Sequence, residues 1–175
     1  MKLILKLTLF FFGLTAIGFS QNTFFIGSKT YPCSDSFLMK SNKEWNGFDL
    51  NVSIIKFEKS GMIALSTQVM DCAVRVSGNI LIYLDDGNVI TCIDRAKFDC
   101  ADSKTTTLYS LSIEEINKLR ISNINTIRFS LKCIKCLSST DEGNYTASNK
   151  ENQDDNPVKE KTDVPILIDK LFNNF

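Results

Sequence analysis

Hydrophobic and polar residues alternate along much of the chain, which is typical of β-strands with one buried face. Phe24-Phe25-Ile26 fits a short first strand. The first long alternation places four apolar side chains on one face: Phe48, Leu50, Val52 and Ile54. At Ile55 the phase slips by one residue, which predicts a bulge or bend in this strand. Lys59-Ser60-Gly61 predicts a turn into a further strand over residues 62–70.

A β-hairpin is predicted over residues 79–93. Two apolar runs, 79–84 and 89–93, flank Asp85-Asp86-Gly87-Asn88, and Asp-Gly between such runs is a strong hairpin signal because Gly accepts a positive φ. A two-residue turn predicts three cross-strand pairs: Leu84 with Val89, Tyr83 with Ile90, and Leu81 with Cys92. Both faces of the hairpin are then apolar, so we expect other elements to cover each face.

One helix is predicted after the hairpin. Ser112 and Glu115 fit a capping box, and three apolar residues at spacing three form a narrow stripe: Ile113, Ile116 and Leu119. The helix is expected to end near Ser122. The next strand alternates strictly and points four residues inward: Ile127, Phe129, Leu131 and Cys133. Its polar outer face indicates an exposed sheet surface or an edge.

The composition changes after Leu137. Residues 138–164 hold few apolar side chains, so we predict a disordered polar linker. Residues 165–175 form a short amphipathic segment with an apolar stripe of five residues: Leu167, Ile168, Leu171, Phe172 and Phe175. About three turns are unstable alone. The segment either folds back to cover the second face of the hairpin or docks onto another envelope or secreted protein.

The N-terminus has the three parts of a secretory signal peptide. Lys2 and Lys6 provide positive charge, residues 7–17 are apolar, and Gly18 and Ser20 are small residues at the expected cleavage site. A spanning helix needs about 20 apolar residues, so we predict cleavage after Ser20 and no membrane span in the mature protein. The chain is therefore expected to be exported, either to the periplasm or outside the cell.

Six cysteines follow the predicted signal peptide: Cys33, Cys72, Cys92, Cys100, Cys133 and Cys136. An even number of cysteines in a small exported chain predicts a disulfide framework, although six cysteines allow 15 pairings. We favour Cys92–Cys100 because these residues bracket a polar loop beside the hairpin. Cys133-Ile-Lys-Cys136 also resembles a redox motif, but no helix is predicted after it, as a reactive cysteine commonly requires.

Composition excludes several classes of function. The sequence contains 20 basic and 20 acidic residues and no histidine. The absence of a concentrated basic region argues against nucleic-acid binding. The absence of histidine excludes Ser-His-Asp and Cys-His catalysis and histidine-ligated metals.

The remaining candidates for chemistry have simpler explanations. A four-cysteine zinc site needs two closely spaced pairs, and only Cys133 and Cys136 form one. The segment 85–88 lacks the ligands of a calcium loop. The loop carboxylates form no acid–base pair that the sequence reveals: Asp71, Asp94, Asp99 and Asp102. Trp45 is interpreted as a plug at one end of the core. We therefore predict no catalytic residue, metal or cofactor.

Three segments carry a resemblance: ILIYLDDGNVIT at residues 80–91, LYSLSIEEINKL at 108–119, and NTIRF at 125–129. With these segments, residues 61–132 resemble a set of small, uncharacterised exported proteins of Bacteroidota-type bacteria. The resemblance implies an exported domain with a hairpin, a capped helix and a following strand. It implies no activity, ligand or catalytic residue.

The sequence thus predicts an α+β fold with one disulfide-stabilised domain over residues 23–137, a mostly antiparallel sheet with one helix packed on it. The disordered tether and the amphipathic segment follow this domain. The expected function is that of an exported, non-enzymatic binding or structural module with an unknown ligand. Two alternatives stay open: a thiol–disulfide protein that uses Cys133 and Cys136, and a small hydrolase inhibitor that uses a disulfide-held loop over residues 93–104.

Overall fold

The computed structural model describes residues 22–43, 47–70, 72–136, 139–150 and 161–173. The predicted signal peptide, Trp45, Asp71 and Phe175 lie outside these residues. A small sheet pairs β1 (Thr23–Ile26) with β2 (Lys29–Pro32). The large sheet has nine strands in the order β7 (Val89–Cys92), β6 (Val74–Leu84), β10 (Ile124–Cys133), β11 (Gly143–Ser148), β3 (Phe37–Ser41), β4 (Leu50–Phe57), β5 (Ser60–Gln68), β9 (Lys104–Leu111) and β8 (Lys97–Ala101). All strand pairs are antiparallel, which confirms a mostly antiparallel β-sheet.

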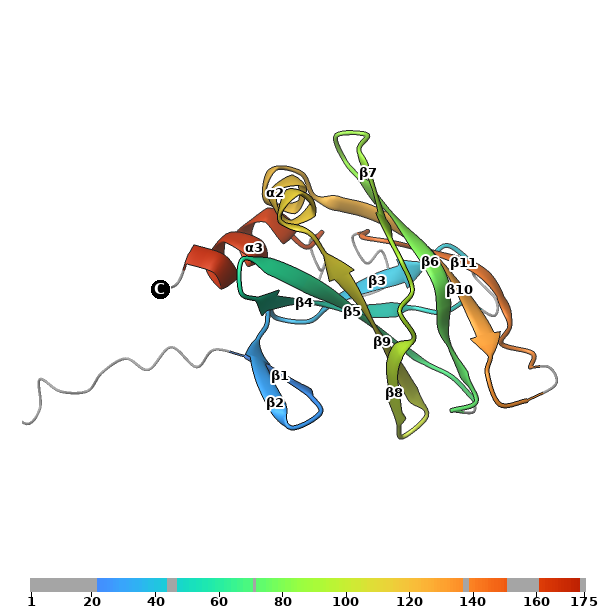
Figure 1. Ribbon diagram of the computed structural model, residues 1–175. Helices are drawn as coiled ribbons and strands as arrows, with labels where there is room; N and C mark the ends of the chain where they lie inside the picture. Colours follow the sequence, from blue (N-terminus) through green and yellow to red (C-terminus); the bar gives the residue numbers. More distant parts are fainter. Residues whose placement is uncertain (1–21, 44–46, 71, 137–138, 151–160, 174–175) are drawn as a thin grey trace, which may run out of the picture.

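The large sheet is rolled, so that β9 near one end lies against β6 near the other. The Tyr109 hydroxyl of β9 donates to the Gly78 carbonyl at 3.0 Å, and the Thr107 hydroxyl donates to the Val76 carbonyl at 2.9 Å. Figure 1 shows β6 and β10 on one side of the roll and β4 and β5 on the other, with the two helices at one end. The main hydrophobic core fills the space between these layers.

The seam between β6 and β9 is bridged by residues 93–96, which join β7 to β8. In this loop the Asp94 carboxylate accepts from Arg75 at 3.0 Å, the Gly78 N–H at 2.8 Å and the Ala96 N–H at 2.7 Å. The Arg75 guanidinium carbon lies 4.8 Å from the Phe98 ring centroid, and only 6% of Arg75 is exposed. The seam is therefore closed by a buried ion pair.

Strand β4 is covered on both faces, which corrects the predicted bulge. Its register with β5 runs without a shift from Asn51–Ser66 to Phe57–Ser60. Ile54 points into the main core, whereas Ile55 lies on the opposite face in a second cluster with Met62 and Ala64. Residues from the small sheet and its surroundings cover this cluster: Phe24, Ile26, Tyr31 and Cys33. The phase slip in the sequence therefore marks a second buried face.

The predicted hairpin is present, but its predicted register is wrong by one residue. The cross-strand partners are Tyr83 with Val89, Ile82 with Ile90, and Ile80 with Cys92. The connection is longer than a two-residue turn, because the Leu84 N–H donates to the Asn88 carbonyl at 2.9 Å. Gly87 has the expected positive φ, 86°.

The new register gathers the buried residues of the hairpin on one face: Ile80, Ile82, Leu84, Ile90 and Cys92. Val89 on the other face is 42% exposed. The expectation that both faces are covered is therefore not met among the described residues.

Helix α2 (Ile113–Ile121) has the predicted capping box. The Ser112 hydroxyl accepts from the Glu115 N–H at 3.2 Å, and the Glu115 carboxylate accepts from the Ser112 N–H at 2.6 Å. Ile116 and Leu119 are buried, whereas Ile113 at the first turn is exposed. A Cβ at Gly61 would lie 2.8 Å from Ile116 Cδ1, so glycine permits this close approach of the helix to β5.

Strand β10 alternates as predicted, with Ile127, Phe129 and Leu131 buried. It is not an edge, however, since it pairs with β6 on one side and β11 on the other. The prediction of a disordered linker over residues 138–164 is wrong for β11, which lies near the middle of the sheet. Only Tyr145 and Ala147 give β11 a buried apolar pair. Polar contacts also join it to β10, such as Ser130 Oγ to Asn144 Oδ1 at 2.6 Å.

The prediction of a single helix is also wrong. Helix α3 (Val164–Asn173) packs against α2 and β4, and its Val164, Ile168 and Leu171 side chains are buried. Leu167 and Phe172 are half-buried against the same core. The amphipathic segment therefore folds back onto the domain, although it covers the α2 end of the sheet and not the hairpin. The Val164 N–H donates to Asn123 Oδ1 at 3.1 Å and fixes the start of the helix.

Removing the negative charge at the seam should destabilise the fold. Burial alone raises the pKa of Asp94, but the hydrogen bonds from Arg75, Ala96 and Gly78 outweigh it and lower the pKa overall. We expect Asp94→Asn to reduce the free energy of unfolding by about 3 kcal/mol, because it leaves Arg75 buried without its counterion. Asp169→Asn, in an exposed pair with Arg120, should cost less than about 1 kcal/mol. Urea unfolding at pH 7 measures both.

The same pair predicts an acid dependence of stability. Because the pKa of Asp94 is lower in the folded protein, the unfolded chain binds the proton first as pH falls below about 4. The contribution of Asp94 is then present above that pH and is lost as pH falls through the folded-state pKa. Asp94→Asn should lose less stability than the wild type between about pH 5 and pH 2. Equal losses in the two proteins would contradict this role.

Candidate functional site

A groove of about 730 Å³ lies between the β1–β2 hairpin and the β8–β9 hairpin, and we call it the hairpin groove. Figure 1 shows both hairpins extending from the same side of the rolled sheet. One wall is formed by residues 24–27 of β1 and its turn. The floor and the other wall come from β5, β8 and β9: Ser66, Gln68, Lys97, Phe98, Asp99, Ala101, Asp102, Lys104, Thr106 and Leu108.

The floor of the hairpin groove is a polar patch beside an apolar one. Ser66 and Thr106 are direct cross-strand partners, and their hydroxyl oxygens lie 2.7 Å apart. Directly opposite residues of antiparallel strands share a face. Lys97, opposite Leu108, and Asp99, opposite Thr106, therefore share the face of the floor. The groove thus combines hydroxyl, ammonium and carboxylate groups with apolar surface, a mixture that is common in binding sites.

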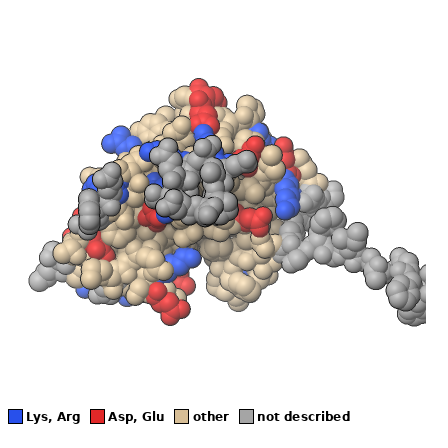
Figure 2. Space-filling model, turned by 180° about the vertical axis from the view of Figure 1, so that it is seen from behind, with Lys and Arg blue, Asp and Glu red and all other residues tan. Residues whose placement is uncertain are grey.

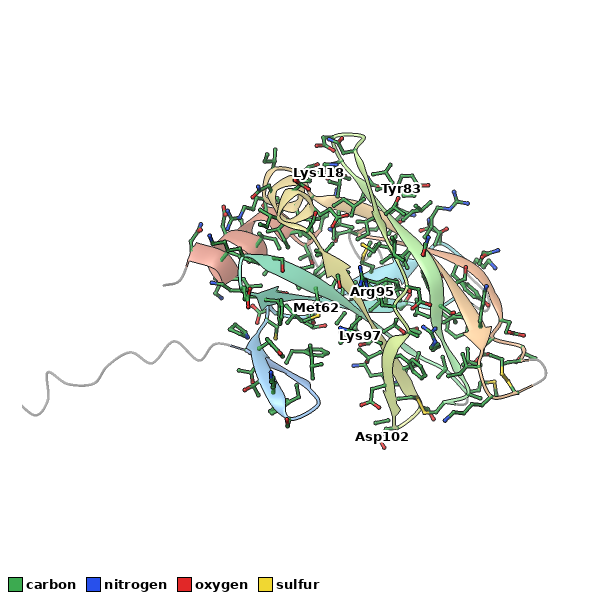
Figure 3. The ribbon with its side chains drawn as sticks, viewed as in Figure 1. Met62, Tyr83, Arg95, Lys97, Asp102 and Lys118 are labelled. Atoms are coloured by element: carbon green, nitrogen blue, oxygen red, sulfur yellow. A yellow bond between two sulfur atoms is a disulfide. The ribbon has the colours of Figure 1, made fainter. Side chains whose placement is uncertain are left out.

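The β8–β9 wall is held in place at its free end. The Cys72–Cys100 disulfide ties β8 to the segment before β6, and the Ser103 carbonyl accepts from the Val69 N–H at 2.8 Å. Asp102 and Ser103 form the turn with φ of 51° and 57°, a region that non-glycine residues rarely adopt. Figure 3 shows Asp102 at this tip and Lys97 farther along the hairpin. These constraints make the wall rigid.

The β1–β2 wall rests on the second hydrophobic cluster. Phe24 and Ile26 pack against the cluster of Ile55, Met62 and Ala64. The Tyr31 and Phe57 ring centroids lie 5.5 Å apart. Phe25, between the two inward residues, is 71% exposed. One wall therefore presents an aromatic side chain to solvent at the rim of the groove.

The disulfides differ from the favoured pairing. Cys72 pairs with Cys100 and Cys133 with Cys136, while Cys33 and Cys92 are free thiols. Cys92–Cys100 is wrong because Cys92 lies opposite Ile80 and faces the core. Burial and the charge of Glu115 raise the pKa of the Cys92 thiol to about 12. Burial and Asp35 also raise the pKa of Cys33, which is half-buried beside Ile55.

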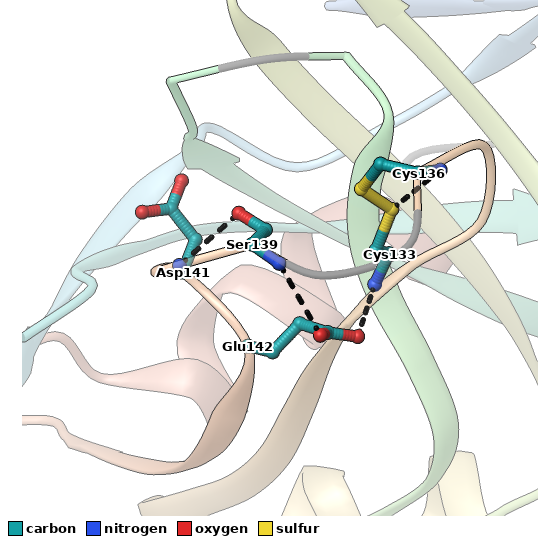
Figure 4. Close-up of a disulfide and its surroundings, with 5 residues drawn as sticks. All are labelled: Cys133, Cys136, Ser139, Asp141 and Glu142. Atoms are coloured by element: carbon teal, nitrogen blue, oxygen red, sulfur yellow. Dashed lines mark hydrogen bonds between the residues drawn. A yellow bond between two sulfur atoms is a disulfide. The ribbon is translucent and has the colours of Figure 1, made fainter.

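The Cys133–Cys136 disulfide lies in the connection between β10 and β11 (Figure 4). The Cys136 N–H donates to Cys133 Sγ at 2.8 Å, and the Cys133 N–H donates to Glu142 Oε1 at 2.8 Å. Glu142 also accepts from the Ser139 N–H at 3.4 Å. The described residues after Cys136 turn into β11 without a helix. The nearby carboxylate disfavours a thiolate, so this arrangement favours a structural disulfide.

The other predicted candidates take structural roles in the described residues. Asp85 accepts from Lys161 at 2.6 Å and from Asn125 at 2.8 Å, and Asp86 accepts from the Asn88 N–H at 2.9 Å. Within the described part of the chain, no group of three or more histidine, cysteine or acidic residues could hold a metal ion. Figure 2 shows basic and acidic side chains interspersed on the opposite side of the molecule.

Sequence reasoning did not find the hairpin groove. It singled out Asp99 and Asp102 as loop carboxylates, and the structure places both in one groove wall. Ser66, Lys97 and Thr106 gave no signal, because they come from three strands that only the sheet pairing brings together. The 93–104 loop proposed for an inhibitor is the segment that contains this wall.

No described helix is long and apolar enough to cross a membrane. Comparison with protein-family models, curated protein sequences and solved structures found no match to this chain. The resemblance to small exported bacterial proteins therefore stays a prediction. The geometry of the hairpin groove carries the functional argument instead.

The thiol chemistry can be checked directly. We expect two free thiols after denaturation without reductant, and peptide mass analysis should link Cys72 to Cys100 and Cys133 to Cys136. In the native protein at pH 8, Cys92 should not react with a chromogenic disulfide reagent, because its thiol is buried and its pKa is about 12. Cys92→Ser should lower the denatured count to one. A Cys92–Cys100 peptide, or rapid native labelling of Cys92, would contradict this assignment.

Proposed function

We propose that this chain is an exported, non-enzymatic binding module and that the hairpin groove is its ligand site. The observation that carries the proposal is the groove itself, with a volume of about 730 Å³ and a mixed polar and apolar lining. One wall is fixed by the Cys72–Cys100 disulfide. A preformed, rigid site lowers the entropy cost of binding.

The contacts inside the groove support binding over catalysis. The Ser66 and Thr106 hydroxyls are hydrogen-bonded to each other. An activated hydroxyl nucleophile needs a base within hydrogen-bond distance, and the contacts of the described residues give these hydroxyls none. The complete sequence has no histidine. These groups are suited to orienting a ligand through hydrogen bonds.

Export is supported by the cysteines and by the N-terminal pattern. Two cysteine pairs at disulfide distance indicate an oxidising environment, outside the cytoplasm. The charged, apolar and small-residue regions of residues 1–20 match a cleavable signal peptide. A periplasmic or fully secreted module is consistent with both.

A hydrolase inhibitor is the second candidate. The β8–β9 hairpin is held by a disulfide and ends in a two-residue turn at Asp102 and Ser103, and a rigid exposed turn is a suitable shape for such a role. The thiol–disulfide alternative is weaker, because Glu142 and not a helix N-terminus lies beside Cys133.

Filling the groove should abolish binding. We expect the Thr106→Trp side chain to occupy the floor of the groove. The affinity for any groove ligand should fall at least about tenfold, because the substitution removes both the space and the hydroxyl pair. Lys132→Trp, on the exposed face of β10, serves as the matched control. Amide chemical-shift mapping against panels of peptides, oligosaccharides and fatty acids measures both. Ligand-induced shifts that map away from the groove, or unchanged binding by Thr106→Trp, would refute the proposal.

Export has its own test. When the whole chain is produced in a bacterial host, the mature protein should begin at Gln21 and appear outside the cytoplasm. Phe11→Arg interrupts the apolar run and should leave the precursor uncleaved. Intact-protein mass spectrometry of the cell fractions distinguishes these products. A wild-type protein that keeps residues 1–20 would contradict the prediction.

A further inference from the structure

We infer that the ligand of the hairpin groove is an extended polypeptide segment, which adds to the free edge of β1 as a third strand. The inference rests on the proposed function, because it names the ligand class of the same groove. It is carried by the unpaired main chain of β1, by the absence of edge protection there, and by the size of the groove.

The free edge of β1 borders the groove. Three consecutive residues of β1, Phe24, Phe25 and Ile26, line it together with Gly27 of the turn. Successive side chains of a strand point to opposite faces, so a cavity that touches every residue in a row runs along the edge of the strand and not over one face. Phe25 on that edge therefore borders the groove, and Thr23 lies just beyond the residues that line it.

The hairpin register identifies which main-chain groups point outward. Residues that flank a two-residue turn form a hydrogen-bonded pair, here Ile26 and Lys29. Hydrogen-bonded and non-hydrogen-bonded pairs then alternate. The Cys33 N–H donates to the Asn22 carbonyl at 2.9 Å, in agreement with this alternation.

Pro32 gives an independent check of the register. It lies opposite Thr23 and has no N–H, so it fits only a non-hydrogen-bonded position. The N–H and carbonyl groups of Thr23 and Phe25 therefore point away from β2. Among the described residues, these four groups have no main-chain partner.

The β1 edge also lacks the devices that protect other edges from pairing. Edge strands commonly carry charges or proline. β2 carries Lys29 and Pro32, and β8 carries Lys97 and Asp99, whereas β1 reads Thr-Phe-Phe-Ile. β7 lies against β9 at the seam. Among the described edge strands, β1 therefore carries the fewest residues that would prevent another strand from pairing with it.

The groove has room for one strand. The three β1 residues that line the groove extend about 10 Å, and a volume of about 730 Å³ over that length corresponds to a cross-section of roughly 73 Å². One strand, spaced about 4.8 Å from its neighbour and about 10 Å from a facing sheet, occupies roughly 48 Å². A second copy of this chain would pair through its own β1 and carry β2 with it, and two strands would need roughly twice that cross-section. A single extended segment therefore fits better.

The lining indicates the side chains that the segment would carry. Alternate residues would face the floor, where Leu108 provides apolar contact and the Ser66–Thr106 pair accepts a small polar group. The other residues would face the rim beside the exposed Phe25. Lys97 and Asp99 present both signs of charge, so the segment needs no strong net charge. A short alternation of apolar and small polar residues meets these requirements.

The experiment uses the mature, disulfide-bonded protein and synthetic octapeptides that alternate threonine with valine, phenylalanine, lysine or glutamate. Titration calorimetry should detect binding of at least one of these peptides. The bound peptide should change the amide chemical shifts of Thr23 and Phe25. In the bound peptide, every second amide N–H would face β1. N-methylation of these amides should lower the affinity of the peptide about tenfold, because their N–H groups pair with β1. Methylation of the other set should change affinity less than about twofold. Equal effects from both sets would overturn strand addition.

Two protein variants separate main-chain from side-chain recognition. Phe25→Pro removes an outward N–H that β2 does not use, and should weaken the peptide about tenfold with the melting temperature retained. Phe25→Ala keeps the N–H and should bind better than Phe25→Pro. If Phe25→Ala loses as much peptide affinity as Phe25→Pro, the peptide contacts the Phe25 side chain and not its N–H, and the inference is wrong.

Further outcomes distinguish this inference from the proposed function. If Thr106→Trp abolishes peptide binding but Phe25→Pro and N-methylation do not, the groove binds a ligand in another way, and only strand addition fails. The same holds if an oligosaccharide or fatty acid shifts the groove residues and no peptide does. A dimer that Phe25→Pro dissociates would identify a second copy as the occupant and overturn the inference.

Discussion

The seam between β6 and β9 carries the buried ion pair of Arg75 and Asp94, and the closure of the sheet depends on it. A sheet of nine twisted strands tends to roll, and its two ends then meet without a continuous ladder of main-chain hydrogen bonds. Asp94 replaces part of that ladder by accepting from Arg75 and from the Gly78 and Ala96 N–H groups. The rolled sheet encloses one large core.

The closed seam also determines where a ligand site can form. The inside of the roll is filled by side chains, so the proposed ligand site lies on the outer face. There the β1–β2 hairpin rests on Ile55, Met62 and Ala64, and the β8–β9 hairpin is held by Cys72–Cys100. The space between these two supports is the hairpin groove. The same packing therefore stabilises the domain and shapes its candidate site.

Local patterns predicted most of the elements. Strict alternation predicted β10, the capping box predicted α2, and Asp86-Gly87 predicted the β6–β7 hairpin. The errors arose where the pattern had two physical explanations. The phase slip at Ile55 indicated a bulge, but a strand with both faces covered gives the same sequence. The polar stretch around β11 indicated disorder, since only Tyr145 and Ala147 reveal a buried face.

The candidate site was harder to predict than the fold. The disulfide partners lie far apart in the sequence, and Cys72–Cys100 closes a separation of 28 residues. Sequence proximity favours Cys92 as the partner of Cys100, but the hairpin register points Cys92 into the core. The groove residues come from β1, β5, β8 and β9, and no local spacing links them.

By itself, the sequence determined the predominance of antiparallel strands, the capped helix and the absence of histidine chemistry, because each follows from residue type or from periodicity within one segment. The tertiary structure decided the order of strands, the cysteine pairing, the folding back of α3 and the existence of the hairpin groove. These depend on which faces meet, and that is settled by the competition of all apolar surfaces for burial.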